Sequence, residues 1–214
     1  MRWKGRSHVQ NSKDDWVDGR HLRSIQTRHK LLEAARVIFL KEGFSKATIS
    51  QVIKLAKTGY GTAYVHFTGK DDLLIVLIED VMAKFFTIAE TPFFPKSKEE
   101  AKDIIYSQVL NFLRLAESER LMMQVFAEAM GLSEAIRTKW GEIQHKFIEG
   151  ITRDIHYSQQ HGLARKDLRA ELVARSWFYS NEMYQWEIVR NEHPASLEEI
   201  AHTLTTMYTD GLYH

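Results

Sequence analysis

Residues 60–67, Tyr-Gly-Thr-Ala-Tyr-Val-His-Phe, combine small, hydroxyl-bearing and aromatic side chains without a single acid. A helix turning about 100° per residue places Ala63 and Phe67 on one face, suited to packing on neighbouring helices. The opposite face holds four residues without negative charge: Gly61, Thr62, Val65 and His66. A surface that meets a nucleic acid should lack carboxylates, because they would oppose the phosphates. The chemistry that this segment predicts is contact with a groove of double-stranded DNA.

Two further helices must hold this segment in place. Apolar side chains recur at helical spacing through residues 31–42, and Gly43 ends that helix. A second helix is predicted over residues 48–56, with Thr48 as its N-cap and Gln51 as the partner three residues later. Two short helices joined by about three residues form the helix-turn-helix, which presents its second helix to the major groove.

The order of these residues resembles the DNA-binding domain of the tetracycline-repressor (TetR) family. The resemblance covers about residues 27–75 and is carried by small residues, aromatics and a trailing lysine: Ala34-Ala35, Phe39, Gly43-Phe44, Thr48-Ile49, Val52, Ala56, the segment 61–67, Lys70 and Leu73-Leu74. It implies an all-α protein with an N-terminal three-helix helix-turn-helix DNA-binding domain and a larger C-terminal helical domain that binds a ligand and dimerises. The predicted divisions are a basic N-terminal arm over 1–26, the DNA-binding domain over 27–72, and the effector-binding and dimerisation domain over 73–214.

The resemblance also implies roles for single residues. Phosphate contacts are implied for Thr48, Tyr64, His66 and Lys70, and base or groove contacts for Tyr60, Gly61, Thr62 and Val65. The chain departs from the family where Lys57 replaces the usual turn glycine, where Gly59 replaces a common serine, and at Ile53 and Tyr60. A helical wheel places Tyr60 nearer the core than the groove. The recognition helix has no Arg, Asn or Gln, so DNA shape must supply part of the specificity.

Charge is divided unevenly along the chain. Residues 1–70 hold 14 Lys and Arg against 5 Asp and Glu, whereas residues 71–214 hold 15 against 23. This indicates that only the front of the chain meets a polyanion. The arm contributes six bases and two tryptophans: Arg2, Lys4, Arg6, Lys13, Arg20, Arg23, Trp3 and Trp16. Two interpretations stay open for it, a basic arm along the DNA backbone or minor groove, and an arm whose tryptophans fold back over apolar surface.

The remainder of the chain reads as helices, about nine in all. Only three prolines occur, and alternating strand patterns are missing. Further N-caps are predicted at Thr68, Ser97, Ser133, Asp167 and Ser196, and helix ends at Gly131 and Gly162. The segment 91–96 is the strongest break, a tight connection in which Phe93 and Phe94 are expected to pack.

The larger domain is predicted to sense a small molecule and to dimerise. Adaptable and aromatic side chains are expected to line an apolar effector pocket: Phe86, Tyr106, Met122, Met123, Phe126, Trp140 and Phe147. Helices near 168–191 and 197–212 resemble the family's dimer interface, to which five residues are assigned: Leu172, Trp177, Phe178, Tyr184 and Trp186. A homodimer predicts a pseudo-palindromic operator, from which a small hydrophobic effector would release the protein as a repressor.

Other functions are weighed against this one. The chain has no cysteine, which excludes disulfides and thiolate metal sites and fits a cytoplasmic protein. It has no apolar run long enough for a membrane and no secretory signal. The spacing of His145, His156 and His161 matches no zinc motif, and no catalytic fingerprint is present, so neither metal, cofactor nor enzyme activity is expected. The alternatives are an architectural or replication-linked DNA-binding protein of the same fold without effector control and, more distantly, an all-helical enzyme.

Overall fold

The computed structural model describes the backbone of residues 11–214 and the side chains of residues 21–214. Within that range the chain forms nine α-helices and a single isolated β-bridge, between Ala164 and Tyr213. The helices are α1 (Asn11–Lys46), α2 (Ile49–Ala56), α3 (Tyr60–His66), α4 (Lys70–Ala89), α5 (Lys98–Ser118), α6 (Arg120–Leu132), α7 (Glu134–Gln160), α8 (Ala170–Arg190) and α9 (Leu197–Leu212). The predicted all-α fold is confirmed.

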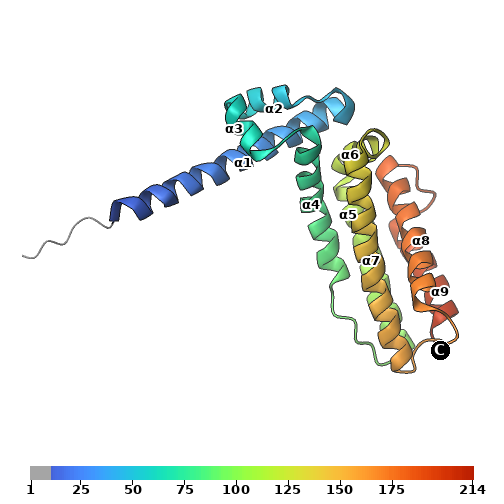
Figure 1. The fold of residues 1–214 in the computed structure, drawn as a ribbon. Helices are drawn as coiled ribbons and strands as arrows, with labels where there is room; N and C mark the ends of the chain where they lie inside the picture. Colours follow the sequence, from blue (N-terminus) through green and yellow to red (C-terminus); the bar gives the residue numbers. More distant parts are fainter. Residues whose placement is uncertain (1–10) are drawn as a thin grey trace, which may run out of the picture.

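The helices α1, α2 and α3 form a small unit at one end of the molecule (Figure 1). Thr48 caps α2, and its capping box with Gln51 is complete. The inner faces of α2 and α3 bury Val52, Ile53 and Ala63 against α1. These contacts fix the direction of the short helix α3, which is too short to be stable without them.

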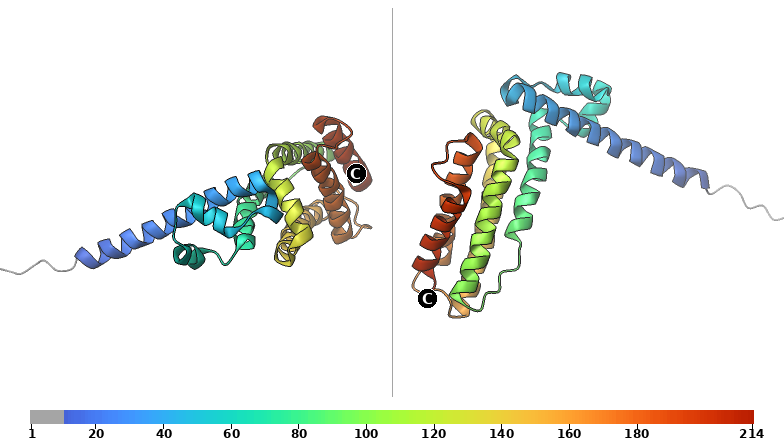
Figure 2. Two further views of the ribbon diagram at one scale, coloured as in Figure 1. Left: turned by 90° about the horizontal axis from the view of Figure 1, so that it is seen from above. Right: turned by 180° about the vertical axis from the view of Figure 1, so that it is seen from behind.

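The first half of α1 projects away from the rest of the molecule, and both further views agree (Figure 2). Residues 21–26 are exposed. The predicted basic arm belongs to α1 from residue 11 onward and is helical there. The predictions for Arg2, Trp3, Lys4 and Arg6 lie outside the described residues, as do the side chains of Lys13, Trp16 and Arg20.

The remaining helices form an elongated body below this unit, with α4, α5, α7, α8 and α9 running along its length and α6 lying next to α1 (Figure 1). The helix α5 packs against α9, and α7 packs against α8. The chain ends at the far end of the body from α1–α3. One continuous core runs from Leu31 and Phe39 in α1 to Leu204 in α9, so the two parts share buried side chains.

Most predicted helix ends are confirmed, and three differ. Ser97, Ser133 and Ser196 are N-caps whose hydroxyls accept backbone N–H groups. Gly69 rather than Thr68 precedes α4, Arg169 rather than Asp167 precedes α8, and α6 continues past Gly131 to Leu132. Asp167 instead pairs with Arg165 at 2.7 Å, which removes its carboxylate from a capping role. In the connection between α4 and α5, Phe93 is buried, whereas Phe94 is mostly exposed and its ring meets that of Tyr157 in a T-shaped arrangement.

Candidate nucleic-acid interface and ligand cavity

The outer side of α3 is exposed and carries no acid. Thr62 is exposed, Val65 is 83% exposed, and His66 is half-buried, whereas Ala63 and Phe67 are buried. Gly61 and Tyr64 are also exposed. This is the division of faces that the helical wheel predicts. The helix therefore presents a surface that phosphates do not oppose.

The structure corrects the wheel at Tyr60. This side chain is 57% exposed rather than close to the core. Tyr60 is the first residue of α3, and the chain before it is extended, so its side chain lies beyond the part of the helix that packs on α1 and α2. Its implied groove contact stays a prediction.

A shallow depression lies between α1 and α3. Ser24, Thr27 and Arg23 of α1 line it together with Gly61, Thr62, Val65 and His66 of α3. The Arg28 guanidinium lies 4.5 Å from the centre of the Phe67 ring. Sequence reasoning did not bring Ser24 and Thr27 to this surface, because the register of α1 against α3 depends on tertiary packing. The basic half of α1 thus borders the candidate DNA surface.

The turn between α2 and α3 holds a non-glycine residue in the left-handed region. Lys57 has φ 52° and ψ 43°, and its N–H and that of Thr58 donate to the last carbonyls of α2. A residue with a Cβ adopts this conformation at a cost of about 1–2 kcal/mol. Lys57, which stands where the family usually has glycine, therefore strains this turn.

Replacing Lys57 with Gly is expected to raise the free energy of unfolding by about 1 kcal/mol, since glycine adopts φ near +52° without a steric penalty. Urea denaturation followed by circular dichroism measures it. The control is Lys54→Gly, a neighbouring exposed lysine inside α2, where glycine should lower stability by about 1 kcal/mol. Equal effects of the two changes would contradict the assignment of strain to the turn.

Thr48 and Lys70, which the resemblance assigns to phosphates, already have partners inside the protein. The Thr48 hydroxyl belongs to the capping box. The Lys70 Nζ donates to the carbonyl oxygens of Phe44, Ser45 and Ala47 at 2.7, 3.3 and 3.2 Å, and lies 4.3 Å from the Phe44 ring centre. These bonds use all three ammonium hydrogens. A phosphate contact from Lys70 stays a prediction and requires the exchange of one of them.

Glu128 of α6 binds the same backbone segment after Gly43 that Lys70 contacts, through amide groups rather than carbonyl groups. Its carboxylate accepts the N–H groups of Phe44 at 2.7 Å and Ser45 at 3.0 Å. Hydrogen bonds from the Ser45 side chain and from these two amides, together with the Lys70 charge, lower the pKa of Glu128. Gly43 interrupts α1 before this turn with φ 74° and ψ 172°, and a Cβ there would lie 2.8 Å from Glu128 Oε2, so the backbone angle and the available space both favour glycine. We call Lys70, Glu128 and the turn 43–47 the joint.

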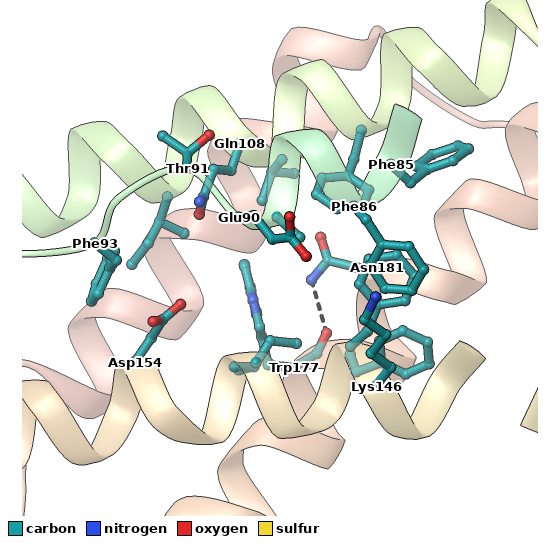
Figure 3. Close-up of a pocket in the computed structure, with 18 of the residues that line it drawn as sticks. Phe85, Phe86, Glu90, Thr91, Phe93, Gln108, Lys146, Asp154, Trp177 and Asn181 are labelled. Carbon is teal, nitrogen blue, oxygen red and sulfur yellow. Dashed lines mark hydrogen bonds between the residues drawn. The ribbon is translucent and has the colours of Figure 1, made fainter. Parts of the chain in front are cut away.

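A cavity of about 360 Å³ lies inside the body (Figure 3), within the usual size range of small-molecule sites. Its aromatic lining comes from α4, α5, α7, α8 and the connection after α4: Phe85, Phe86, Phe93, Phe112, Trp140, Phe147, Trp177 and Phe178. Phe86 stacks on Phe147 with ring centres 4.3 Å apart, and Phe147 stacks on Phe178 at 6.1 Å. The walls therefore suit a flat or apolar ligand.

Three of the seven residues predicted for this pocket line it: Phe86, Trp140 and Phe147. The other four lie elsewhere. Met122, Met123 and Phe126 are fully buried in the core on the inner side of α6, and Tyr106 lies on a different side of α5 from Ile105, Gln108 and Val109. Helical periodicity marks the buried face of a helix, but it does not say whether that face meets other side chains or a cavity.

Some of the residues predicted for a subunit interface line the cavity, and others are exposed on the surface. Trp177 and Phe178 line the cavity, Trp177 stacks on Tyr208 at 4.1 Å, and Trp186 lies 5.7 Å from Trp140. Tyr184 is half-buried. Leu172 is exposed, and three further exposed apolar side chains share α8 and α9 with it: Tyr179, Met183 and Met207. The aromatic rings that indicated an interface thus lie largely within the subunit.

The charged groups of the cavity differ in their surroundings. Glu182 Oε1 accepts hydrogen bonds from Trp140 Nε1 at 2.9 Å and Gln144 Nε2 at 2.8 Å, with Trp186 Nε1 at 3.4 Å. Lys146 Nζ lies 3.9 Å from the centre of the Phe86 ring. Asp154 has no hydrogen-bond partner for its carboxylate among residues 21–214. Burial raises its pKa from 3.8 to about 6, and the Arg153 charge opposes that rise.

The histidines considered for metal binding have separate surroundings. His145 pairs with Glu149, His156 with Glu171, and His161 stacks on Tyr157. No group of three metal-ligating side chains occurs in the described part of the chain. Nor is any described helix both long enough and apolar enough to cross a membrane.

Comparisons with known proteins agree with this geometry. The family model described as "Bacterial regulatory proteins, tetR family" matches residues 31–77. The model described as "Transcriptional regulator EthR, C-terminal domain" matches residues 106–214, about half of the chain. Together they span the helix-turn-helix and most of the body.

Individual relatives are distant in sequence and similar in length. The "Fatty acid metabolism regulator protein" of Bacillus subtilis is 22% identical over 86% of this chain and 95% of its own. The regulator UidR of Escherichia coli is 26% identical over 74% of this chain and 80% of its own. The solved structure of Salmonella enterica GusR has a TM-score of 0.68 at 21% identity, covering 86% of this chain and 94% of that one.

The solved SmeT–triclosan complex also has a TM-score of 0.68, at 15% identity, covering 88% of this chain and 92% of that one. At such identities the solved structures show the shared fold, and the two family models, matched in chain order, show the relationship itself. The chain belongs to the TetR family of transcriptional regulators.

Proposed function

We propose that the protein is a ligand-responsive repressor that binds a pseudo-palindromic DNA operator as a homodimer and leaves it when a small hydrophobic effector binds. The observation that carries DNA binding is the outer side of α3, where Thr62 and Val65 are exposed, His66 is half-exposed and no acid occurs. Phosphates tolerate such a surface. The Thr62 and Val65 methyl groups can contact thymine methyls in the major groove.

Dimerisation through α8 and α9 is supported by exposed apolar side chains at helical spacing. Leu172, Tyr179 and Met183 share one side of α8, and Met207 of α9 is exposed as well. Two copies related by a twofold axis would present two α3 helices to one side of a duplex. We expect a dimer by light scattering at micromolar concentration and a monomer for Met183→Glu. A wild-type monomer that still binds operator tightly would contradict the proposal.

The cavity supports the effector part of the proposal. Of the helices that line it, α4 begins at Lys70, and α7 and α8 pack against α6, the helix that carries Glu128. Phe126 of α6 meets the cavity residue Trp140 with ring centres 5.5 Å apart. A ligand that moves Trp140 would therefore press on α6 and on the start of α4. A tilt of these helices would change the spacing of the two reading heads.

The test begins with the DNA. Selection of bound duplexes from a random pool by the full-length protein should return a pseudo-palindromic site. A thermal-shift screen then finds small molecules that stabilise the protein, and each is tested for release of that site. Ligands that stabilise without loosening DNA would favour the architectural or replication-linked alternative. A pool that yields no enriched site would contradict a sequence-specific regulator.

Replacing Glu128 with Ala should uncouple the two sites. The change removes the acceptor for the Phe44 and Ser45 amides. We expect a loss of about 1–2 kcal/mol in unfolding free energy. The ratio of the operator Kd with effector to the operator Kd without it measures the coupling between the two sites. We also expect this ratio to fall at least about fivefold. Equilibrium denaturation measures the first and fluorescence anisotropy with labelled operator the second.

The matched control is Gln124→Ala on the same helix. Gln124 Nε2 donates to the Val189 carbonyl at 2.7 Å, so it joins α6 to α8 rather than to the DNA-binding unit. The Gln124→Ala substitution should therefore leave the ratio of the operator Kd values with and without effector unchanged. A Glu128→Ala protein with the wild-type ratio would show that the joint does not transmit effector binding.

A further inference from the structure

The carboxylate of Asp154 is a lining group whose charge the apolar walls of the cavity do not explain. It projects from α7 at the end of the cavity near Phe93, at the opposite end from Lys146 in Figure 3. Its side chain is half-buried, and no hydrogen-bond donor from residues 21–214 reaches it. Even partial burial of a charge without a partner is unfavourable. Such a group is retained most readily when something absent from the free protein pairs with it.

The neighbouring polar groups do not supply that partner. The Tyr213 hydroxyl is shared with Ser158 Oγ at 3.2 Å. The Arg153 side chain is exposed and acts on Asp154 only through space. Burial is the main cause that raises the pKa values of Tyr208 and Tyr213, and the charge of Asp154 is a smaller cause in the same direction. Among residues 21–214, none therefore gives the Asp154 carboxylate a hydrogen bond or an ion pair.

Four other charged residues line the cavity, two acids and two bases. Glu182 Oε1 accepts hydrogen bonds from three donors, while Glu90, an exposed residue, points its carboxylate into the space between Gln108 and Asn181 (Figure 3). The two bases, Lys146 and Arg153, are exposed to solvent. Lys146 moreover shows that an aromatic wall here accepts a cation, since its ammonium lies over the Phe86 ring.

We propose that the cavity binds an amphipathic cation, an aromatic or alicyclic body with an ammonium group that pairs with Asp154. The apolar body would lie against Trp177 and the Phe86–Phe147 stack. This inference rests on the proposed function of the cavity as the effector site and narrows its ligand class. A carboxylate ligand would instead place its charge against Asp154 and Glu90.

Three probes that share one ring system test the charge. They are 2-naphthylmethylamine, 2-naphthylmethanol and 2-naphthylacetate, titrated into the full-length protein by calorimetry. The amine should bind about 30-fold more tightly than the alcohol, as a charge-assisted hydrogen bond provides, and the acetate more weakly than either. Asp154→Asn should reduce the preference for the amine to less than about threefold. The control Glu149→Gln, on the exposed side of the same helix, should keep it.

Three results would overturn the proposal. They are equal affinity for amine and alcohol, an unchanged preference for the amine in Asp154→Asn, or no amine binding at about 1 mM. Operator release is measured separately with the same probes. If the alcohol or the acetate releases operator while the amine shows no advantage, the cavity is the effector site and only the cationic ligand class is wrong. If the amine binds with the expected preference but never releases operator, the ligand class holds and effector control fails.

Discussion

Asp154→Asn is expected to stabilise the ligand-free protein by about 2 kcal/mol near pH 7.5. Burial raises the pKa of the Asp154 carboxyl from 3.8 to about 6. A difference of that size corresponds to about 3 kcal/mol as an upper limit. The smaller value is expected because the side chain keeps some contact with water and with the field of Arg153. Asparagine has nearly the same shape and carries no charge to desolvate.

The pH dependence gives this prediction a signature. The folded-state pKa is higher than the unfolded-state value, so the cost of ionising Asp154 is present above about pH 6. It fades as the pH falls through this value and is absent below about pH 4, where both states are protonated. The stability gap between the variant and the wild type should therefore close on acidification. Urea unfolding at several pH values measures the gap.

The control for this series is Glu149→Gln on the same helix. The Glu149 side chain is exposed and pairs with His145 rather than facing the cavity. The substitution should change stability by less than about 0.5 kcal/mol. A gap for Asp154→Asn that is absent at neutral pH, or that stays constant down to pH near 4, would show that the carboxylate is not destabilising. A positive result would mark Asp154 as a group kept in spite of its effect on stability, as binding residues often are.

Val65→Glu is expected to weaken operator binding by at least about 100-fold without changing thermal stability. Val65 is 83% exposed in the middle of the outer side of α3, so a charged side chain at this position should leave the fold intact. In the proposed complex a carboxylate there enters the groove among phosphates, and like charges in a desolvated interface cost several kcal/mol. Fluorescence anisotropy with the selected operator measures the affinity, and a thermal melt measures the fold.

Leu121→Glu serves as the matched change, because Leu121 of α6 is 60% exposed and lies outside the candidate DNA surface. It introduces the same charge at a position of similar exposure and should change operator affinity less than about threefold. If both substitutions weaken binding equally, the effect comes from net charge rather than from the outer side of α3. If Val65→Glu binds like the wild type, α3 is not the recognition helix.

The local sequence determined the helical fold and the candidate DNA surface. Helical spacing and the absence of acids in residues 60–67 defined which side of α3 is free, because a short helix with two buried positions has only one way to pack. The Thr48–Gln51 capping box set the start of α2 in the same way, since its partners are three residues apart. The helical wheel wrongly placed Tyr60 near the core, because Tyr60 is the first residue of α3 and its side chain lies beyond the packed part of the helix.

The tertiary structure alone decided the cavity and the joint. Phe86, Trp140 and Trp177 meet there from three helices, and periodicity gave Met122 and Phe126 the same apolar character although they pack in the core. Lys70 and Glu128 reach the turn after Gly43 across 26 and 84 residues of chain. A sequence pattern reports which face of a helix avoids water. It cannot report what that face meets, since this depends on how distant helices pack against one another.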